Sequence, residues 1–256
     1  KYSLMSRPYS KNREVNTVNI ASRKNRTLPS EISWINFTLP VRDQGKCGSS
    51  AFATVAVAEA SIGINANEGA NQTNWNVQLS EQDLIDCSRH FKMGCREGTV
   101  QEAMMSAYRQ GISPASEYPY TQSIGECRHN NRTAIHPFEW SVVRLNGTEI
   151  DMELFVAFKG PVTTEFFVPE SLLYYKGGVF NDDNCIQNGL GTQYAAVIGY
   201  GVEHGMDYWL VKNSWGADWG DNGYFKIARG KNMCDLSRDS FQLDEHPLDP
   251  PQYLDH

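Results

Sequence analysis

Residues 44–60, QGKCGSSAFATVAVAEA, decide how this chain folds. A polar turn that contains Gly45 and Gly48 leads into an Ala/Val-rich run that is long enough for a buried helix. A glycine-rich turn before a helix N-terminus aims backbone N–H groups at one point and stabilises negative charge there. Enzymes place a nucleophile at such a point, and in this chain Ser49 and Ser50 stand there.

The composition is that of a soluble globular protein with one large domain or two lobes around a cleft. The chain has 256 residues, of which 40% are apolar and 21% are charged. Its net charge of −7 argues against a nucleic-acid partner, and no apolar run is long enough to span a membrane. The Cys/His spacings are not those of a metal site, so we expect neither a metal nor another cofactor.

The two ends of the chain differ from the rest in charge. Residues 1–27 carry seven Lys/Arg and one acidic residue, so they form a basic arm. Residues 243–256 are acidic and contain proline, and we expect a surface tail there.

Six cysteines and five N-glycosylation sequons together indicate an oxidising compartment. The even number of cysteines is compatible with disulfides, although sequence alone does not fix their pairing. The sequons begin at Asn25, Asn36, Asn71, Asn131 and Asn146. We therefore predict a secreted, extracellular protein.

The first half of the chain has helical patterns and the second half has strand patterns. Residues 51–64 have a helical composition, Ser80 begins a capping pattern, and Thr99 caps a helix that closes at Gly111. Aromatic and β-branched residues predict strands over residues 160–168, 193–202, 207–215 and 224–228. Helices followed by strands predict an α+β fold.

The opening stretch closely resembles the active-site segment of papain-like cysteine proteases, in which Q-G-x-C-G-S-C-W-A-F-S begins the central helix. Other family motifs follow in order: LSEQDLIDC at 79–87, GC at 94–95, YPY at 118–120, GPV at 160–162, YYKGGVF at 174–180, GYG at 199–201 and KNSWGADWGDNGY at 212–224. Their order and spacing over residues 28–242 make the resemblance specific. It implies a two-lobed domain over 28–242, with a helical lobe over roughly 45–130, an antiparallel β-barrel lobe over roughly 131–242, and a groove between them.

The resemblance also implies roles for residues outside the opening stretch. The mature enzymes begin near a Leu-Pro that matches Leu28-Pro29, so residues 1–27 are interpreted as a propeptide remnant. Family members hold the substrate backbone with a glycine pair, of which Gly98 is kept and Glu97 replaces the other, so we expect a narrower and more negative groove. The implied disulfides are Cys47–Cys95, Cys87–Cys127 and Cys185–Cys234.

Family catalysis needs a thiolate beside a histidine, and the sequence has neither at the matching positions. Ser50 takes the nucleophile position when counted from Cys47, and Ser49 takes it when counted back from Glu59. Gln193 stands six residues before GYG, where the histidine is expected. A glutamine amide does not take up a proton near neutral pH.

Other parts of the family site are kept. Gln44 matches the oxyanion glutamine, Asn213 matches the asparagine that orients the histidine, and Trp215 matches its shielding indole. The histidines of this chain are expected on the surface or in loops. Gln44, Asn213 and Trp215 are kept around the site, whereas the nucleophile and the histidine are replaced. The sequence therefore predicts a proteolytically inactive pseudoprotease and not an enzyme.

Such a chain is expected to act by binding. We predict a monomer that holds a protein or peptide ligand in or near the groove, such as a protease inhibitor or a host protein, and so competes with active proteases or modulates host defence. Two alternatives stay open, a residual serine-type hydrolase that uses Ser50 or Ser49, and a structural or storage protein on the same scaffold. SEIS at 30–33 and DYWLVKNSW at 207–215 resemble group 1 mite allergens. In its replaced reactive groups the chain also resembles the inactivated cysteine-protease paralogues of scabies mites.

Overall fold

The computed structural model describes residues 16–17, 27–68, 76–88, 95, 98–128, 133–136 and 141–244. Its helices are α1 (Ser50–Glu68), α2 (Glu81–Cys87), α3 (Val100–Gln110), α4 (Glu149–Phe158) and α5 (Glu170–Leu173), with the 3₁₀ helices η2 (Ile35–Phe37) and η4 (Met233–Asp235). Its strands are β1 (Asn16–Thr17), β2 (Ile32–Ser33), β3 (Ser141–Arg144), β4 (Val162–Pro169), β5 (Val179–Phe180), β6 (Gly189–Glu203), β7 (Met206–Lys212), β8 (Tyr224–Ala228) and β9 (Phe241–Asp244).

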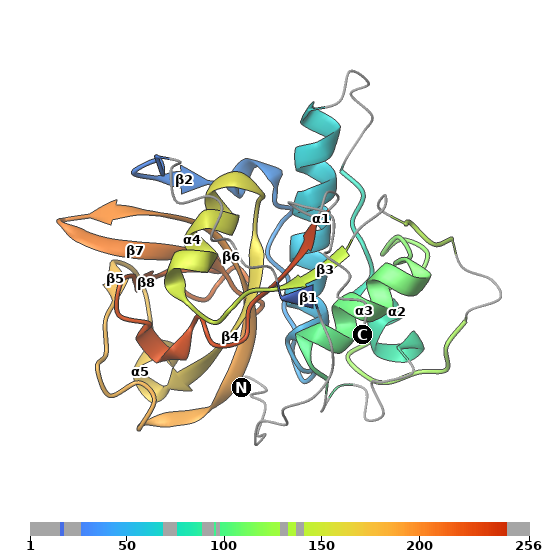
Figure 1. Ribbon diagram of the computed structural model, residues 1–256. Coiled ribbons are helices and arrows are strands. Elements are labelled where there is room, and N and C mark those ends of the chain that lie inside the picture. The colour runs from blue at the N-terminus through green and yellow to red at the C-terminus, as the bar shows by residue number, and fades with distance from the viewer. Residues whose placement is uncertain are drawn as a thin grey trace, which may run out of the picture.

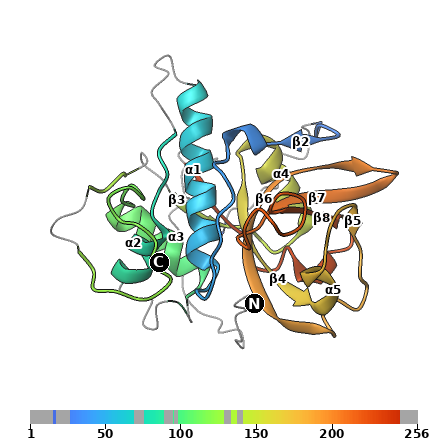
Figure 2. The same cartoon turned by 180° about the vertical axis from the view of Figure 1, so that it is seen from behind.

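The described strands form one sheet, in the order β1-β3-β9-β4-β6-β7-β8-β5, with β2 paired to β6. The pairs β1–β3 and β5–β8 are parallel, and the other pairs are antiparallel. Figure 1 shows α1 standing between strands β4 to β8 on one side and α2 and α3 on the other, and the reverse view in Figure 2 agrees. The other end of the sheet crosses α1 in both views, and its strands β3 and β9 contact α3. The predicted α+β fold is confirmed.

Strand β6 separates two hydrophobic cores because its side chains alternate between them. Ala195 and Val197 face the core of the sheet lobe, which includes Trp209. Ala196 and Ile198 face the core of the helical lobe, which includes Val55 of α1. Because both faces of β6 are covered, a residue on this strand lies where the two lobes meet.

The helices begin and end where capping chemistry predicts. The side chain of Ser80 accepts a hydrogen bond from the backbone N–H of Asp83 at the start of α2. Thr99 and Glu102 form a capping box at the start of α3, and Gly111 ends that helix with a φ of 68°. These signals are local in the chain, so the sequence reveals them directly.

Three segments differ from what the sequence predicted. Helix α4 lies within the half that was predicted to be β. Strand β9 runs to Asp244, into the range predicted as a surface tail, and its Leu243 is buried in the core of the helical lobe. Strand β1 lies within the predicted basic arm and pairs with β3.

The N-terminal part of the domain reaches the sheet lobe through β2, which pairs with β6. A Cβ atom added to Gly199 would lie 2.3 Å from the carbonyl oxygen of Ile32, so this close approach requires glycine at the start of GYG. The disulfides are Cys47–Cys95, Cys87–Cys127 and Cys185–Cys234, the pairs that the resemblance implies. None of the helices in the described segments has both the length and the apolar character of a membrane span.

Candidate functional site

The residues that sequence analysis selected come together where the lobes meet. Gln44 ends the segment before α1, and its backbone N–H donates to the carbonyl oxygen of Ser214 at 2.8 Å. Ser50 is the first residue of α1, and Gln193 lies on β6. Asn213 directly follows β7, and hydrogen bonds join it and Gln44 to Gln193, so three separate parts of the chain meet in one cluster.

One amide group links the parts of this site. The Nε2 of Gln193 lies 2.7 Å from Gln44 Oε1, 3.0 Å from Asn213 Oδ1 and 3.2 Å from Ser214 Oγ. The Oγ of Ser214 donates to Gln44 Oε1 at 2.6 Å. Gln193 is therefore held where the resemblance implies a histidine, by the same Asn213 that is expected to orient that histidine.

The directions of these amides are fixed by their neighbours. Asn213 Oδ1 accepts from the backbone N–H of Ser214 at 2.9 Å, so its oxygen must face Gln193. Gln44 Nε2 donates to the carbonyl oxygen of Cys47 at 2.9 Å, so its Oε1 also faces Gln193. Two buried atoms of the cluster, Gln193 Oε1 and Asn213 Nδ2, have no hydrogen-bond partner.

The two serines that compete for the nucleophile position have different surroundings. Ser49 Oγ accepts from the backbone N–H of Tyr194 at 2.7 Å, which ties it to the strand that carries Gln193. Ser50 opens the 19-residue helix α1, where the helix N-terminus favours negative charge. Both serines are buried. Trp215 is also buried and stacks edge-on against Trp219, with ring centroids 4.7 Å apart.

Within the described segments, neither a free thiol nor an imidazole contacts Gln193. All six cysteines are in disulfides. Of the histidines, His136 and His204 lie in the described segments, and both are exposed. His204 lies in the turn between β6 and β7, at the hairpin tip that points away from α1 in Figure 1. The polar side chains that contact Gln193 are therefore amides and a hydroxyl.

Several predicted residues lie away from this cluster or outside the description. Gly98 is buried just before α3. Asn36 and Asn146 are exposed, as a glycan requires. The remaining predictions lie outside the described residues, namely Glu97, Asn25, Asn71 and Asn131. Within the described segments, no group of three or more His, Cys, Asp and Glu side chains is arranged to hold a metal.

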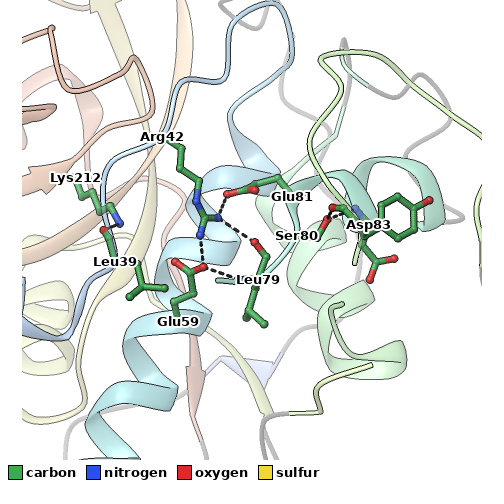
Figure 3. A network of polar contacts seen from close by, with 9 residues as sticks. Leu39, Arg42, Glu59, Leu79, Ser80, Glu81, Asp83 and Lys212 are labelled. Carbon is green, nitrogen blue, oxygen red and sulfur yellow. Dashed lines mark hydrogen bonds and ion pairs between the residues drawn. The ribbon is translucent and has the colours of Figure 1, made fainter. Parts of the chain in front are cut away.

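Sequence analysis missed a buried network of charges beside the site, which Figure 3 shows. The guanidinium of Arg42 binds both Glu59 of α1 and Glu81 of α2, and donates to the carbonyl oxygen of Leu79 at 3.0 Å. Glu59 also accepts from the backbone N–H of Leu79 at 2.8 Å. A lone glutamate within the apolar run of α1 is the sequence signal that points to such a buried partner.

The protonation of this network is set mainly by burial. Burial raises the pKa of both Glu59 and Glu81 above its ordinary value, although Arg42 opposes the shift. Burial alone would lower the pKa of Arg42, but the two carboxylates raise it overall, so the guanidinium stays charged. Burial lowers the pKa of Lys212 to about 8. The lysine comes from β7, which brings a second cation to the same region.

A family model described as papain family cysteine protease matches residues 28–242. Mouse pro-cathepsin H is 37% identical over 217 residues, which cover 82% of this chain and 63% of the relative. The rice oryzain gamma chain is 38% identical over 216 residues, which cover 82% and 58%. The chain therefore spans about three fifths of the length of these curated relatives.

Solved structures agree with this match. Procathepsin L2 from the larval midgut of Tenebrio molitor superposes with a TM-score of 0.81 at 31% identity, covering 94% of this chain and 77% of the other. Bromelain from Ananas comosus in complex with the inhibitor E64 gives a TM-score of 0.74 at 29% identity, covering 86% and 100%.

These findings correct one prediction. The sequence analysis concluded that the chain is not an enzyme because Ser50 and Gln193 replace the reactive groups. That conclusion is wrong against the comparisons, because relatives at 36–38% identity are named as cysteine proteinases or thiol proteases, and none of these names points to a loss of activity. The chain belongs to the papain family of cysteine proteases.

Proposed function

We propose that this chain recognises a peptide or an extended protein segment where its two lobes meet. One observation carries the proposal: Gln193 joins Gln44, Asn213 and Ser214 in a single hydrogen-bonded cluster that spans the lobes. These groups are neutral at physiological pH, and neutral amides and hydroxyls are suited to binding the peptide backbone.

The unpartnered Oε1 of Gln193 supports a backbone ligand in particular. It is a buried hydrogen-bond acceptor without a donor, which costs free energy until a donor reaches it. The N–H group of a peptide is such a donor. Because the cluster is buried, ligand entry requires the lobes to part slightly, as hinge motions at binding sites do.

The experiment is a titration of the folded chain with labelled peptides and a peptide aldehyde, followed by fluorescence polarisation. We expect saturable binding that weakens at least tenfold in Gln193→Leu. Gln187→Leu, at an exposed turn position, is the matched control and should bind as the parent chain does. The absence of saturable binding, or equal affinity in Gln193→Leu, would overturn the proposal.

The biological setting is proposed on the same basis. We infer a secreted monomer whose partners are protease inhibitors or host proteins, so that it competes with other proteases or modulates host defence. Three disulfides suit an oxidising compartment. Affinity capture with the folded chain, compared with capture by Gln193→Leu, tests the partner, and gel filtration tests the monomer.

A second candidate function is hydrolysis of peptide bonds through Ser50. The comparisons favour it, because the family consists of proteases, and Ser50 lies at the N-terminus of α1, where an oxyanion would be stabilised. Turnover of a fluorogenic peptide panel that is lost in Ser50→Ala but kept in Ser49→Ala would establish this function. Turnover that is insensitive to both substitutions would exclude it.

A further inference from the structure

The side chain of Tyr120 reaches from the helical lobe to the main chain of Gln44. Its hydroxyl donates to the carbonyl oxygen of Gln44 at 2.6 Å, although the two residues are 76 positions apart in the chain. Its ring lies edge-on against Phe52 in the first turn of α1, with the ring centroids 5.1 Å apart. Because Phe52 is buried, this contact holds the ring and therefore the direction of the hydroxyl.

Gln44 is held from both lobes. Its backbone N–H donates to the carbonyl oxygen of Ser214 on the sheet side, and its Oε1 accepts from Gln193 Nε2 at 2.7 Å. Its carbonyl oxygen accepts from Tyr120 and from the backbone N–H of Cys47, at 3.0 Å from the latter. A carbonyl oxygen has two lone pairs, and these two donors use both of them. Gln44 is fully buried, so loss of the hydroxyl would leave one lone pair without a donor.

The turn that follows Gln44 packs against the same segment of the helical lobe. Gly45 has a φ of 53°, and a Cβ atom added there would lie 2.4 Å from the side-chain oxygen of Gln122, two residues after Tyr120. A turn at glycine has more backbone freedom than a turn at other residues. The position of the Gln44 peptide is therefore set by contacts from this distant segment as well as by the local chain.

The Tyr120 hydroxyl keeps its proton at physiological pH. Burial is the main cause that raises the pKa of this side chain above its ordinary value, and the charges of Glu81 and Asp43 raise it further. A tyrosine side chain can donate a hydrogen bond only while it is protonated. The bond to the Gln44 carbonyl is thus present whenever the chain is folded near neutral pH.

We propose that Tyr120 is a positioning residue for the candidate site, because its hydroxyl fixes the main chain of Gln44 and so aims Gln44 Oε1 at Gln193. The inference rests on the proposed function, in which the cluster around Gln193 binds the backbone of a peptide. A site whose groups are held in place before the ligand arrives loses less conformational entropy on binding. Loss of the hydroxyl therefore weakens binding although Gln193 itself is unchanged.

The test begins with Tyr120→Phe, which removes the hydroxyl and keeps the ring against Phe52. We expect the affinity for labelled peptide to fall about two- to tenfold, the effect of one hydrogen bond, in a fluorescence polarisation titration. Tyr200→Phe is the matched control, because the Tyr200 hydroxyl also donates to a backbone carbonyl, that of Pro29 at 3.1 Å, and its ring lies edge-on against Trp209. The control should bind as the parent does. Equal affinity in Tyr120→Phe and the parent would overturn the proposal.

A double-mutant cycle distinguishes positioning from a purely structural role. Gln44→Met removes the Oε1 that contacts Gln193 but keeps the backbone carbonyl that Tyr120 holds. In that background, Tyr120→Phe should leave peptide affinity unchanged while it still lowers the thermal midpoint. The same loss of affinity from Tyr120→Phe in both backgrounds would contradict the proposal, because the hydroxyl would then act by a route other than Gln44 Oε1.

NMR spectra of the free, isotope-labelled chain give a readout that needs no ligand. The side-chain amide protons of Gln193, which donate to Gln44 Oε1, should shift in Tyr120→Phe and keep their positions in Tyr200→Phe. If the parent chain binds no peptide, the proposed function fails, and these spectra still decide whether Tyr120 positions the cluster. Unchanged Gln193 resonances in Tyr120→Phe would overturn the positioning role even where the parent binds peptide.

Discussion

At the scale of single residues, Gln193 shows how one amide can hold a buried polar site together. It lies 3.0 Å from Asn213 Oδ1 and also contacts Gln44 and Ser214. A protonated imidazole would require a nearby negative charge, whereas a neutral amide can be satisfied by the oxygen atoms already present. The site is thus held together by hydrogen bonds between neutral groups.

We predict that Gln193→Leu lowers the free energy of unfolding by about 1–3 kcal/mol, because buried acceptors on Gln44 and Asn213 lose a donor. Urea denaturation followed by fluorescence measures the change. Gln187→Leu, at an exposed position, is the control and should stay within about 0.5 kcal/mol of the parent. An equal effect of both substitutions would show that the Gln193 contacts do not contribute to stability.

The sequence predicted which residues form this site but not how their atoms are paired. Motif spacing placed Gln44, Gln193 and Asn213 at matching family positions, and the structure brings them together. The contacts of Gln193 join residues that are 149 and 20 positions apart in the chain, to Gln44 and to Asn213. Motif spacing carries no information on these contacts.

At the scale of elements, a cluster of charges joins β3, β4 and the start of β9. Asp239, just before β9, pairs with Arg144 at the end of β3 at 3.1 Å. Arg238 pairs with Glu165 of β4 at 3.2 Å. Burial raises the pKa of Asp239 to about 6, and Glu165 adds to the shift while Arg144 opposes it. The ionised form of Asp239 is therefore unfavourable in the fold relative to the unfolded chain.

The raised pKa of Asp239 predicts the direction in which the free energy of unfolding changes with pH. A carboxyl group whose pKa is raised by folding contributes stability that is present below its unfolded pKa and is lost as pH rises. Between about pH 4 and 6, we predict that the parent chain loses about 1–3 kcal/mol that Asp239→Asn does not lose. Urea denaturation at several pH values gives both curves.

The other buried acids remain in both chains, so the difference between the curves isolates Asp239. Asp183→Asn provides the matched control, because its side chain is 80% exposed, and its curve should follow that of the parent. Parallel curves for the parent and Asp239→Asn would refute the assignment.

Elements that are defined by local signals were predicted, and those defined by distant contacts were not. The caps of α2 and α3 are formed by residues that lie within three positions of each other in the chain. Helix α4 carried a comparable signal, since Thr148 accepts from the N–H of Asp151, but the strand patterns of the second half obscured it. Strand β9 lies in an acidic stretch and becomes a strand through its partners β3 and β4.

At the scale of the whole molecule, the segment 39–44 fastens the two lobes to each other. On the sheet side, Lys212 holds the carbonyl oxygen of Leu39, and Gly216 donates to the carbonyl oxygen of Arg42 at 3.1 Å. On the helical side, the Arg42 side chain binds Glu59 and Glu81. The same short segment ends at Gln44, so the fastening of the lobes and the geometry of the site depend on each other.

Arg42→Met is expected to destabilise the whole chain by about 3–5 kcal/mol, because two buried carboxylates lose their cation. The side chains of Glu59 and Glu81 are only 2% and 4% exposed, so water cannot replace the guanidinium. Without Arg42 the pKa values of both acids rise further, and protonation then relieves the cost. The loss should therefore shrink as the pH is lowered from 7 to 5, in denaturant titrations at each pH.

The triple variant Arg42→Met, Glu59→Met, Glu81→Met tests why Arg42→Met is destabilising. It distinguishes the cost of leaving two buried carboxylates unpaired from the loss of the other contacts of Arg42. If the cost of Arg42→Met comes from unpaired buried carboxylates, removing them should restore most of the stability, since apolar replacements of buried ion networks are often tolerated. Arg109→Met, on the exposed face of α3, controls for loss of an arginine and should change stability by less than about 0.5 kcal/mol. A triple variant as unstable as the single one would mean that Arg42 acts through its bond to the Leu79 carbonyl and its packing, and not through the two acids.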